Sequence, residues 1–189
     1  MKIKRTIFAA LALALLLCTA CAKEAPPPAI PPSTPGTVTI SFDFERQKGY
    51  STNQYAVWIG TQDETVVKTL FATKFTAEGG YKKRPSSLSD WVSRAVRTGI
   101  TDPDAVAGAT PKSGPVSYVW DCTDEQGKAV SAGTYKFFIE YTFRVGEGST
   151  GGHVEWGEIE VGGADVTAEA QEVDGGFDLI SNIKAQYTA

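Results

Sequence analysis

Residues 38–45, Val-Thr-Ile-Ser-Phe-Asp-Phe-Glu, alternate apolar and polar side chains without a break. A period of two places successive side chains on opposite faces, which predicts a strand with one face in a core. Residues 54–59 and 65–72 carry further β-type runs, and Asp63-Glu64 between them has the composition of a turn. We expect these three strands to form a meander with one face in the core.

The same signals return in the second half of the chain, where glycines cluster between the apolar runs. Many short strands separated by glycine-rich turns are typical of an antiparallel β-sandwich, and we predict a mainly β fold of this kind. The candidate strands are residues 116–120, 134–145, 153–161, 165–173 and 177–183.

One segment, residues 86–98, breaks this pattern because its apolar side chains recur at helical spacing. Ser87 is a suitable N-cap, and Gly99 would end the helix. We expect one short helix, packed across an edge or an end of the sheet. The side chains on its apolar face would be Leu88, Trp91, Val92, Ala95 and Val96.

The first twenty residues have the features of an export signal. Three cationic residues within positions 2–5 precede an apolar run over residues 7–17, which is too short for a permanent membrane span. The run ends in Cys18-Thr19-Ala20-Cys21, which resembles the lipobox of bacterial lipoproteins. The resemblance implies cleavage before Cys21 and lipidation of that cysteine. The alternative is an ordinary signal peptide or membrane anchor.

Six prolines between Pro26 and Pro35 predict an extended spacer after the lipidated cysteine. We therefore divide the chain into a signal peptide at residues 1–20, a lipidated cysteine with a proline-rich linker at 21–36, and one β-sandwich domain at 37–189. The domain would be lipid-anchored to the bacterial membrane in the extracytoplasmic space, either periplasmic or at the cell surface.

Composition argues against several classes of function. The mature chain would keep only Cys21 and Cys122, so Cys122 has no partner for an internal disulfide. His153 is the one histidine, which argues against a Cys/His metal site and against histidine-based catalysis. A net charge of -4 argues against nucleic acid, and the basic residues 82–84 are predicted to lie in a solvated loop. We expect no catalytic residue and no metal ligand.

The segment from Asp104 to Thr110, Asp-Ala-Val-Ala-Gly-Ala-Thr, is a candidate for cofactor attachment. It resembles the Asp-x-x-(Ser/Thr)-Gly-Ala-Thr acceptor of flavin-carrying subunits in bacterial sodium-pumping and related redox complexes. There an extracytoplasmic flavin transferase splits FAD and links FMN through its phosphate to the threonine. The resemblance implies that Thr110 is the acceptor, that Asp104 is recognised by the transferase, and that Gly108 and Ala109 leave room for the phosphate. Ala107 departs from the pattern, and the residues alone indicate a turn-rich loop.

A wider set of motifs resembles the predicted periplasmic family named domain of unknown function 2271, over most of residues 38 to 145. Members are typically linked with flavin transferases and with membrane reductases bearing PepSY-type regions. The resemblance implies an electron carrier with covalent FMN, not a stand-alone enzyme, whose partners are a flavin transferase and a membrane reductase. The motifs are Tyr55 to Ile59, Val67 to Leu70, Trp91, Asp104 to Lys112, Gly114-Pro115 and Trp120 to Tyr135.

Residues 120–135 also resemble a hairpin of the immunoglobulin-like domain in flagellar hook-capping proteins. Asp121 and Asp124 are placed to accept hydrogen bonds from turn amides, and Gly127 to adopt a positive φ. Cys122 stands where that pattern has glycine. The predicted fold class is thus an antiparallel Ig-like β-sandwich with one short helix. The alternative function is a non-catalytic Ig-like surface binding or scaffolding module.

Four aromatic residues flank the candidate segment in sequence: Tyr81, Trp91, Tyr118 and Trp120. Such rings could stack on a flavin, but aromatic side chains more often fill a core. We expect core packing for each and assign none of them to a site.

Overall fold

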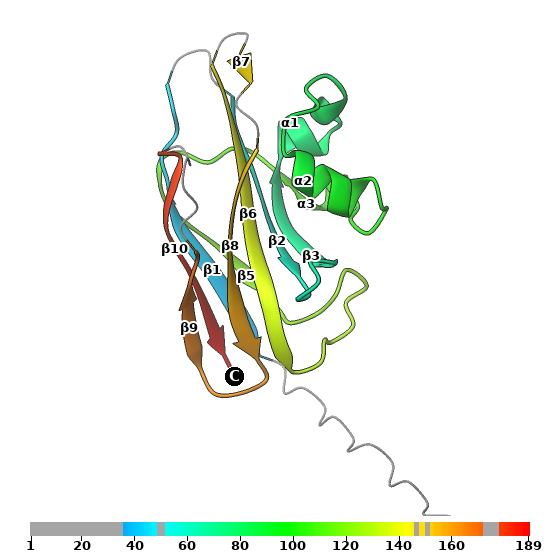
Figure 1. Cartoon of the computed structure of the whole chain (residues 1–189), viewed down its shortest axis with the longest axis vertical. Coiled ribbons are helices and arrows are strands. Elements are labelled where there is room, and N and C mark those ends of the chain that lie inside the picture. The colour runs from blue at the N-terminus through cyan, green and yellow to red at the C-terminus, as the bar shows by residue number, and fades with distance from the viewer. Residues whose placement is uncertain (1–35, 49–51, 146–147, 150–151, 172–177) are drawn as a thin grey trace, which may run out of the picture.

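Two β-sheets packed face to face, with short helices on one side, make up the domain in the computed structural model (Figure 1). The structure describes residues 36–48, 52–145, 148–149, 152–171 and 178–189. The predicted signal peptide, Cys21 and the linker up to residue 35 lie outside the described residues. The predicted mainly β sandwich is confirmed.

The first sheet has the strand order β5-β1-β10-β9, and each neighbouring pair is antiparallel. In β1 the apolar side chains predicted to face the core, from Val38 to Phe44, are buried. The period of two therefore predicted the buried face of this strand correctly. The strands are β1 (Thr37–Phe44), β5 (Gly114–Trp120), β9 (Val166–Glu169) and β10 (Ile180–Thr188).

The second sheet has the order β4-β3-β2-β6, and both β7 and β8 pair with β6. The predicted three-strand meander is wrong, because β1 lies in the first sheet and only β2 and β3 form a hairpin. Alternation of side chains specifies which face is buried but not which strand is the neighbour. The strands are β2 (Thr52–Gly60), β3 (Val66–Thr73), β4 (Ala107–Gly108), β6 (Gly133–Val145), β7 (Gly148–Ser149) and β8 (His153–Val161).

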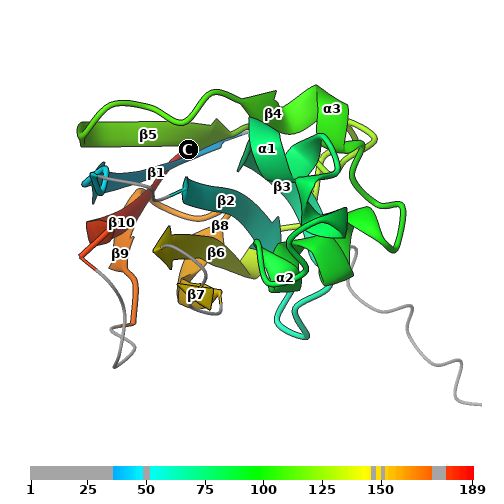
Figure 2. The same ribbon diagram turned by 90° about the horizontal axis from the view of Figure 1, so that it is seen from above.

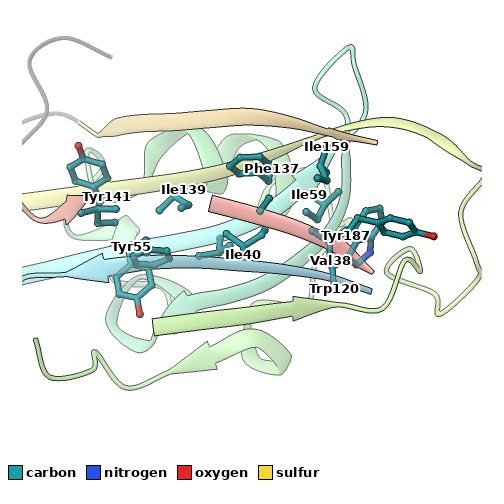
Figure 3. Packing of buried hydrophobic residues seen from close by; sticks show 14 of the residues in the cluster. Val38, Ile40, Tyr55, Ile59, Trp120, Phe137, Ile139, Tyr141, Ile159 and Tyr187 are labelled. Carbon is teal, nitrogen blue, oxygen red and sulfur yellow. The ribbon is translucent and has the colours of Figure 1, made fainter. Parts of the chain in front are cut away.

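The core between the sheets is built from aliphatic and aromatic side chains of both layers (Figure 3). Strand β2 is buried on both faces. Tyr55, Val57 and Ile59 belong to this core, whereas Ala56 and Trp58 pack under the helices. The expectation that β2 buries only one face is therefore wrong, because the sheet has a third layer on its outer side.

That third layer consists of several short helical segments. The helix predicted over residues 86–98 is confirmed as α2 and η2, and the other segments were not predicted. The layer covers the outer face of the second sheet and not an edge or end, as Figure 2 shows. Leu88, Trp91 and Val92 pack with Trp58 and Phe138 of the sheet. The segments are α1 (Lys74–Ala77), η1 (Gly80–Lys82), α2 (Ser89–Trp91), the π-helical η2 (Val92–Val96) that continues it, and α3 (Pro103–Val106).

A buried carboxylate from the sheet caps the start of α2, so the predicted cap at Ser87 is wrong. Glu140 of β6 accepts hydrogen bonds from the backbone N–H of Trp91 at 2.7 Å and of Asp90 at 3.1 Å. The Ser87 hydroxyl instead bonds to Thr76 at 2.8 Å. Because a Cβ at Gly152 would collide with the Glu140 carboxylate, this glycine leaves the space that the cap needs. Glu140 thus ties the helical layer to the sheet.

Replacing Glu140 by glutamine is expected to change how stability depends on pH. Burial raises the pKa of Glu140 from 4.5 to about 7, against the two N–H donors that favour its charged form. The folded state therefore holds the proton more tightly, and the stability that this group contributes is lost as the pH rises from about 4.5 through 7.

Urea unfolding of both proteins across that pH window tests this assignment. As the pH rises through this window, the wild-type protein should lose about 1 kcal/mol or more of unfolding free energy relative to Glu140→Gln. The reason is that one unit of pKa shift corresponds to about 1.4 kcal/mol. Other titrating groups affect both proteins alike. Parallel pH profiles would show that Glu140 keeps an ordinary pKa.

Candidate functional site

The chain between β4 and β5 crosses from the second sheet to the first and carries the candidate acceptor. Ala107 and Gly108 pair in parallel with Ala72 and Thr73 of β3, and β5 then begins at Gly114 beside Phe44 of β1. Residues 109–113, called the crossing segment here, therefore join the edges of the two layers (Figure 2). The sequence motif thus lies where both sheets meet at one end of the sandwich.

The residues before the crossing segment form the short helix α3. The Asp102 carboxylate accepts a hydrogen bond from the N–H of Asp104 at 3.1 Å, and Pro103 occupies the first helical turn. Pro at this position and Asp at the cap are favourable for starting a helix. The arrangement leaves Asp104 exposed, six residues before Thr110 in the chain.

Gly108 lies directly against the ring of Phe71, and any side chain at this position would collide with that ring. Its backbone pairing with Thr73 fixes the chain two residues before Thr110. The glycine of the motif therefore serves close packing of the loop on the sheet in this structure.

Gly108→Val is expected to displace the loop from β3, because the new side chain must push Phe71 or the backbone aside. Hydrogen–deuterium exchange of residues 107–113 should accelerate. The adjacent Ala109 is exposed, so Ala109→Val is the matched control and should change stability by no more than about 0.5 kcal/mol. Equal exchange in the two variants would contradict the close packing of Gly108.

Thr110 is half-buried, and its hydroxyl donates a hydrogen bond to the backbone carbonyl of Asn53 at 3.3 Å. The same carbonyl accepts a second hydrogen bond, from Gln54 Nε2 at 3.1 Å. Further along, the Ser113 hydroxyl accepts from the N–H of Arg46 at 2.9 Å. The crossing segment is thus bonded to β2 and to the chain just after β1, while Ala109 and Lys112 remain exposed.

A buried polar network lies beneath Thr110, and sequence reasoning missed it. The Asn53 side chain accepts from the N–H of Gln47 at 2.8 Å and donates to its carbonyl at 3.1 Å. Gln54 Oε1 accepts from the hydroxyls of Thr73 at 2.7 Å and Thr76 at 3.2 Å. The available signal was the pair Asn53-Gln54 at the start of an otherwise apolar strand. This network holds the backbone on which the Thr110 hydroxyl rests.

The flanking aromatic residues divide into two groups. Trp91 and Trp120 are fully buried, which confirms core packing for both, and Tyr81 is partly buried against the helical layer. Tyr118 is only half-buried, and its hydroxyl shares a 2.5 Å hydrogen bond with that of Tyr55. Burial raises the pKa of both phenols, so both stay protonated at neutral pH.

Two other groups singled out in the sequence lie elsewhere. The Cys122 thiol is buried, and burial followed by the charge of Asp121 raises its pKa to about 11. The predicted turn around it is confirmed, since Asp124 accepts from the N–H groups of Gln126 and Lys128. His153 Nε2 lies 3.2 Å from Glu155 Oε1. Among the described residues no group of three or more His, Cys, Asp or Glu could hold a metal ion.

Comparison of the sequence with known protein families identifies the family of this chain. The model of a family described as a predicted periplasmic protein, DUF2271, matches residues 36–177. The chain belongs to the DUF2271 family. The DUF2271 match contains the whole motif from Asp104 to Thr110 and extends well past residue 145, where the resemblance drawn from motifs ended.

Membership in DUF2271 supports a periplasmic location. Within the part of the chain that the structure describes, no helix has the length and apolar character needed to cross a membrane. No curated protein and no solved structure matches the chain.

Proposed function

We propose that this DUF2271 protein is a lipid-anchored periplasmic electron carrier, with Cys21 as the lipidated residue and FMN attached through its phosphate to Thr110. The observation that carries the proposal is the position of Thr110 within its motif. Its hydroxyl lies on a surface segment that is held in place on both sides.

The residues around Thr110 fit a covalently bound flavin phosphate. Modification removes the hydroxyl hydrogen and with it the bond to Asn53, but the Asn53 carbonyl keeps its second donor, Gln54 Nε2. No buried acceptor is therefore left unsatisfied, which avoids a cost of about 1–3 kcal/mol. Exposed Ala109 adds little bulk, and exposed Lys112 supplies a nearby positive charge.

Attachment would be a group transfer from FAD. The Thr110 oxygen forms a bond to the FMN phosphorus, the pyrophosphate bond breaks, AMP leaves with the bridging oxygen, and the hydroxyl proton is released. A partner flavin transferase would supply the catalytic groups. The crossing segment would present the nucleophile, and exposed Asp104 would contribute to recognition.

Bound flavin supplies reversible electron uptake and release, and a covalent link keeps it with its carrier outside the cytoplasm. We propose a membrane reductase of PepSY type as the electron donor. The chain's own residues would hold the cofactor and expose it to partners, so the protein is proposed to be a carrier and not a stand-alone enzyme.

The test is co-expression of the full-length chain with an extracytoplasmic flavin transferase. The peptide containing Thr110 should gain the mass of one FMN moiety, and the protein band should show flavin fluorescence in a gel. A transferase that modifies a control substrate but adds no mass here would refute the proposal. The alternative, a non-catalytic binding or scaffolding module, would then be the better reading.

A further inference from the structure

The sandwich has an open side between β3 of the second sheet and β5 of the first. Along residues 66–71, no described strand pairs with β3 on the side away from β2, because β4 pairs only with Ala72 and Thr73. Partly buried apolar side chains from both strands pack against the core along this side. They are Val67, Leu70 and Phe71 from β3, and Val116 and Tyr118 from β5.

Two segments cover this side at its ends. Toward one end, Glu125 donates its N–H to the Val67 carbonyl at 3.0 Å, and its carboxylate accepts from the N–H of Thr69 at 2.9 Å. Toward the other end, Gly108 lies on the ring of Phe71. Phe71 and Tyr118 therefore lie between a loop that covers Val67 to Thr69 and the segment that carries Thr110.

The rings of Phe71 and Tyr118 form a continuous aromatic surface. Their centroids are 4.9 Å apart with an interplanar angle of 30°, and the ring of buried Tyr55 lies 5.0 Å from that of Phe71. The hydrogen bond between the Tyr118 and Tyr55 hydroxyls fixes the orientation of the outer ring. Both outer residues are only partly buried, in contrast to Tyr55.

Thr110 lies within reach of this surface. Thr110 comes two residues after Gly108, which lies against the Phe71 ring. Its hydroxyl bonds to the backbone carbonyl of Asn53, and Asn53 precedes Tyr55 by two residues in β2. A planar aromatic ring held on Thr110 by a flexible chain can therefore pack against these rings. Offset aromatic pairs at such separations contribute about 0.5–1.5 kcal/mol beyond the burial of apolar area.

We propose that the isoalloxazine ring of FMN attached to Thr110 packs against Phe71 and Tyr118 on the open side between β3 and β5. The proposal rests on the proposed attachment of FMN. It assigns a cofactor-contact role to Tyr118, for which the sequence favoured core packing alone, and to Phe71. One face of the flavin would then be shielded from water by the protein.

Flavin fluorescence tests the proposal, because stacking on an aromatic ring quenches it. In the loaded full-length protein, fluorescence per FMN should be several-fold lower than that of free FMN, and iodide should quench it less. Tyr118→Leu and Phe71→Leu should each raise the fluorescence and the access of iodide, with FMN loading retained. Tyr118→Phe, which keeps the ring and loses the hydroxyl, should remain close to the wild type.

Tyr135→Leu is the matched control. Tyr135 is half-buried like Tyr118, but it packs on Trp120 near the opposite end of the sandwich. A loaded wild-type protein whose flavin is as accessible to iodide as free FMN would overturn the proposal whether or not the leucine variants fold. If the folded leucine variants at Phe71 and Tyr118 carried FMN with the same fluorescence as the wild type, the stacking proposal would also be refuted. The proposed carrier function would not be affected by that result. Absence of FMN from the Thr110 peptide would instead refute the carrier function.

Discussion

Thr110→Ala is expected to abolish FMN loading completely, because the substitution removes the oxygen of the proposed phosphoester. The fold should be unaffected. Thr110 contributes a single hydrogen bond of 3.3 Å to a carbonyl that has another donor, so the loss in stability should be about 1 kcal/mol or less. Peptide mass and in-gel fluorescence measure loading, and urea unfolding measures stability.

Ser113 provides the matched control, because it is a second hydroxyl on the same exposed stretch of chain. Its oxygen accepts from the N–H of Arg46 at 2.9 Å, as part of the attachment to the first sheet. Ser113→Ala should keep full loading, and Thr110→Ser should keep an acceptor. If FMN persisted on Thr110→Ala and disappeared from Ser113→Ala, the motif would have been assigned to the wrong hydroxyl.

Trp91→Ala is expected to lower the free energy of unfolding by about 3–5 kcal/mol, the usual cost of truncating a buried tryptophan. Trp91 is completely buried between the helical layer and the second sheet, and its indole N–H donates to the Thr69 hydroxyl at 3.1 Å. A domain of this size is stable by only about 5–15 kcal/mol, so the variant should be close to unfolding. Urea unfolding measures the effect.

Trp91→Phe separates packing from hydrogen bonding at this site. Phenylalanine keeps much of the ring volume and loses the indole N–H, while Thr69 keeps its bond to Thr101. The expected loss is about 1–2 kcal/mol. If Trp91→Ala cost no more than Trp91→Phe, the helices would be a loose cover and not part of the core.

Most of the longer strands were predictable because each depends on a local pattern. The two-residue strands β4 and β7 were not predicted, and β10 continues to Thr188, beyond the predicted end at residue 183. The alternation around Val38 and Ile40 gave both the strand and its buried face. The partners of β1 were not predictable, because β5 and β10 both lie far along the chain and are joined to β1 by backbone hydrogen bonds that any sequence can make. The meander failed for that reason.

The helical segment shows a second limit of local patterns. Its apolar face was visible in the sequence, but its cap comes from Glu140, about fifty residues later in the chain. Glu140, within the otherwise apolar run from Phe137 to Tyr141, was the available sign of a buried carboxyl group with a partner.

The sequence motif of the candidate site was predictable, but its position in the fold and its contacts were not. Thr110, Gly108 and Asp104 were recognised from their order in the chain. The contacts that give them positions, the Asn53 carbonyl and the Phe71 ring, lie on other strands, and one of them is a backbone group without a sequence signature. Only the folded topology brings them together.

The direction of β1 sets the mechanics of a tethered domain. The described chain enters the sheet at Thr37, whereas Phe44, at the far end of the same strand, pairs with Gly114 beside the crossing segment. Eight residues of strand span about 25 Å. With the proposed lipid anchor on its N-terminal side, the domain would be held at one end and Thr110 would lie near the other. Reorientation of the domain would then change the distance between Thr110 and the membrane by about the length of β1.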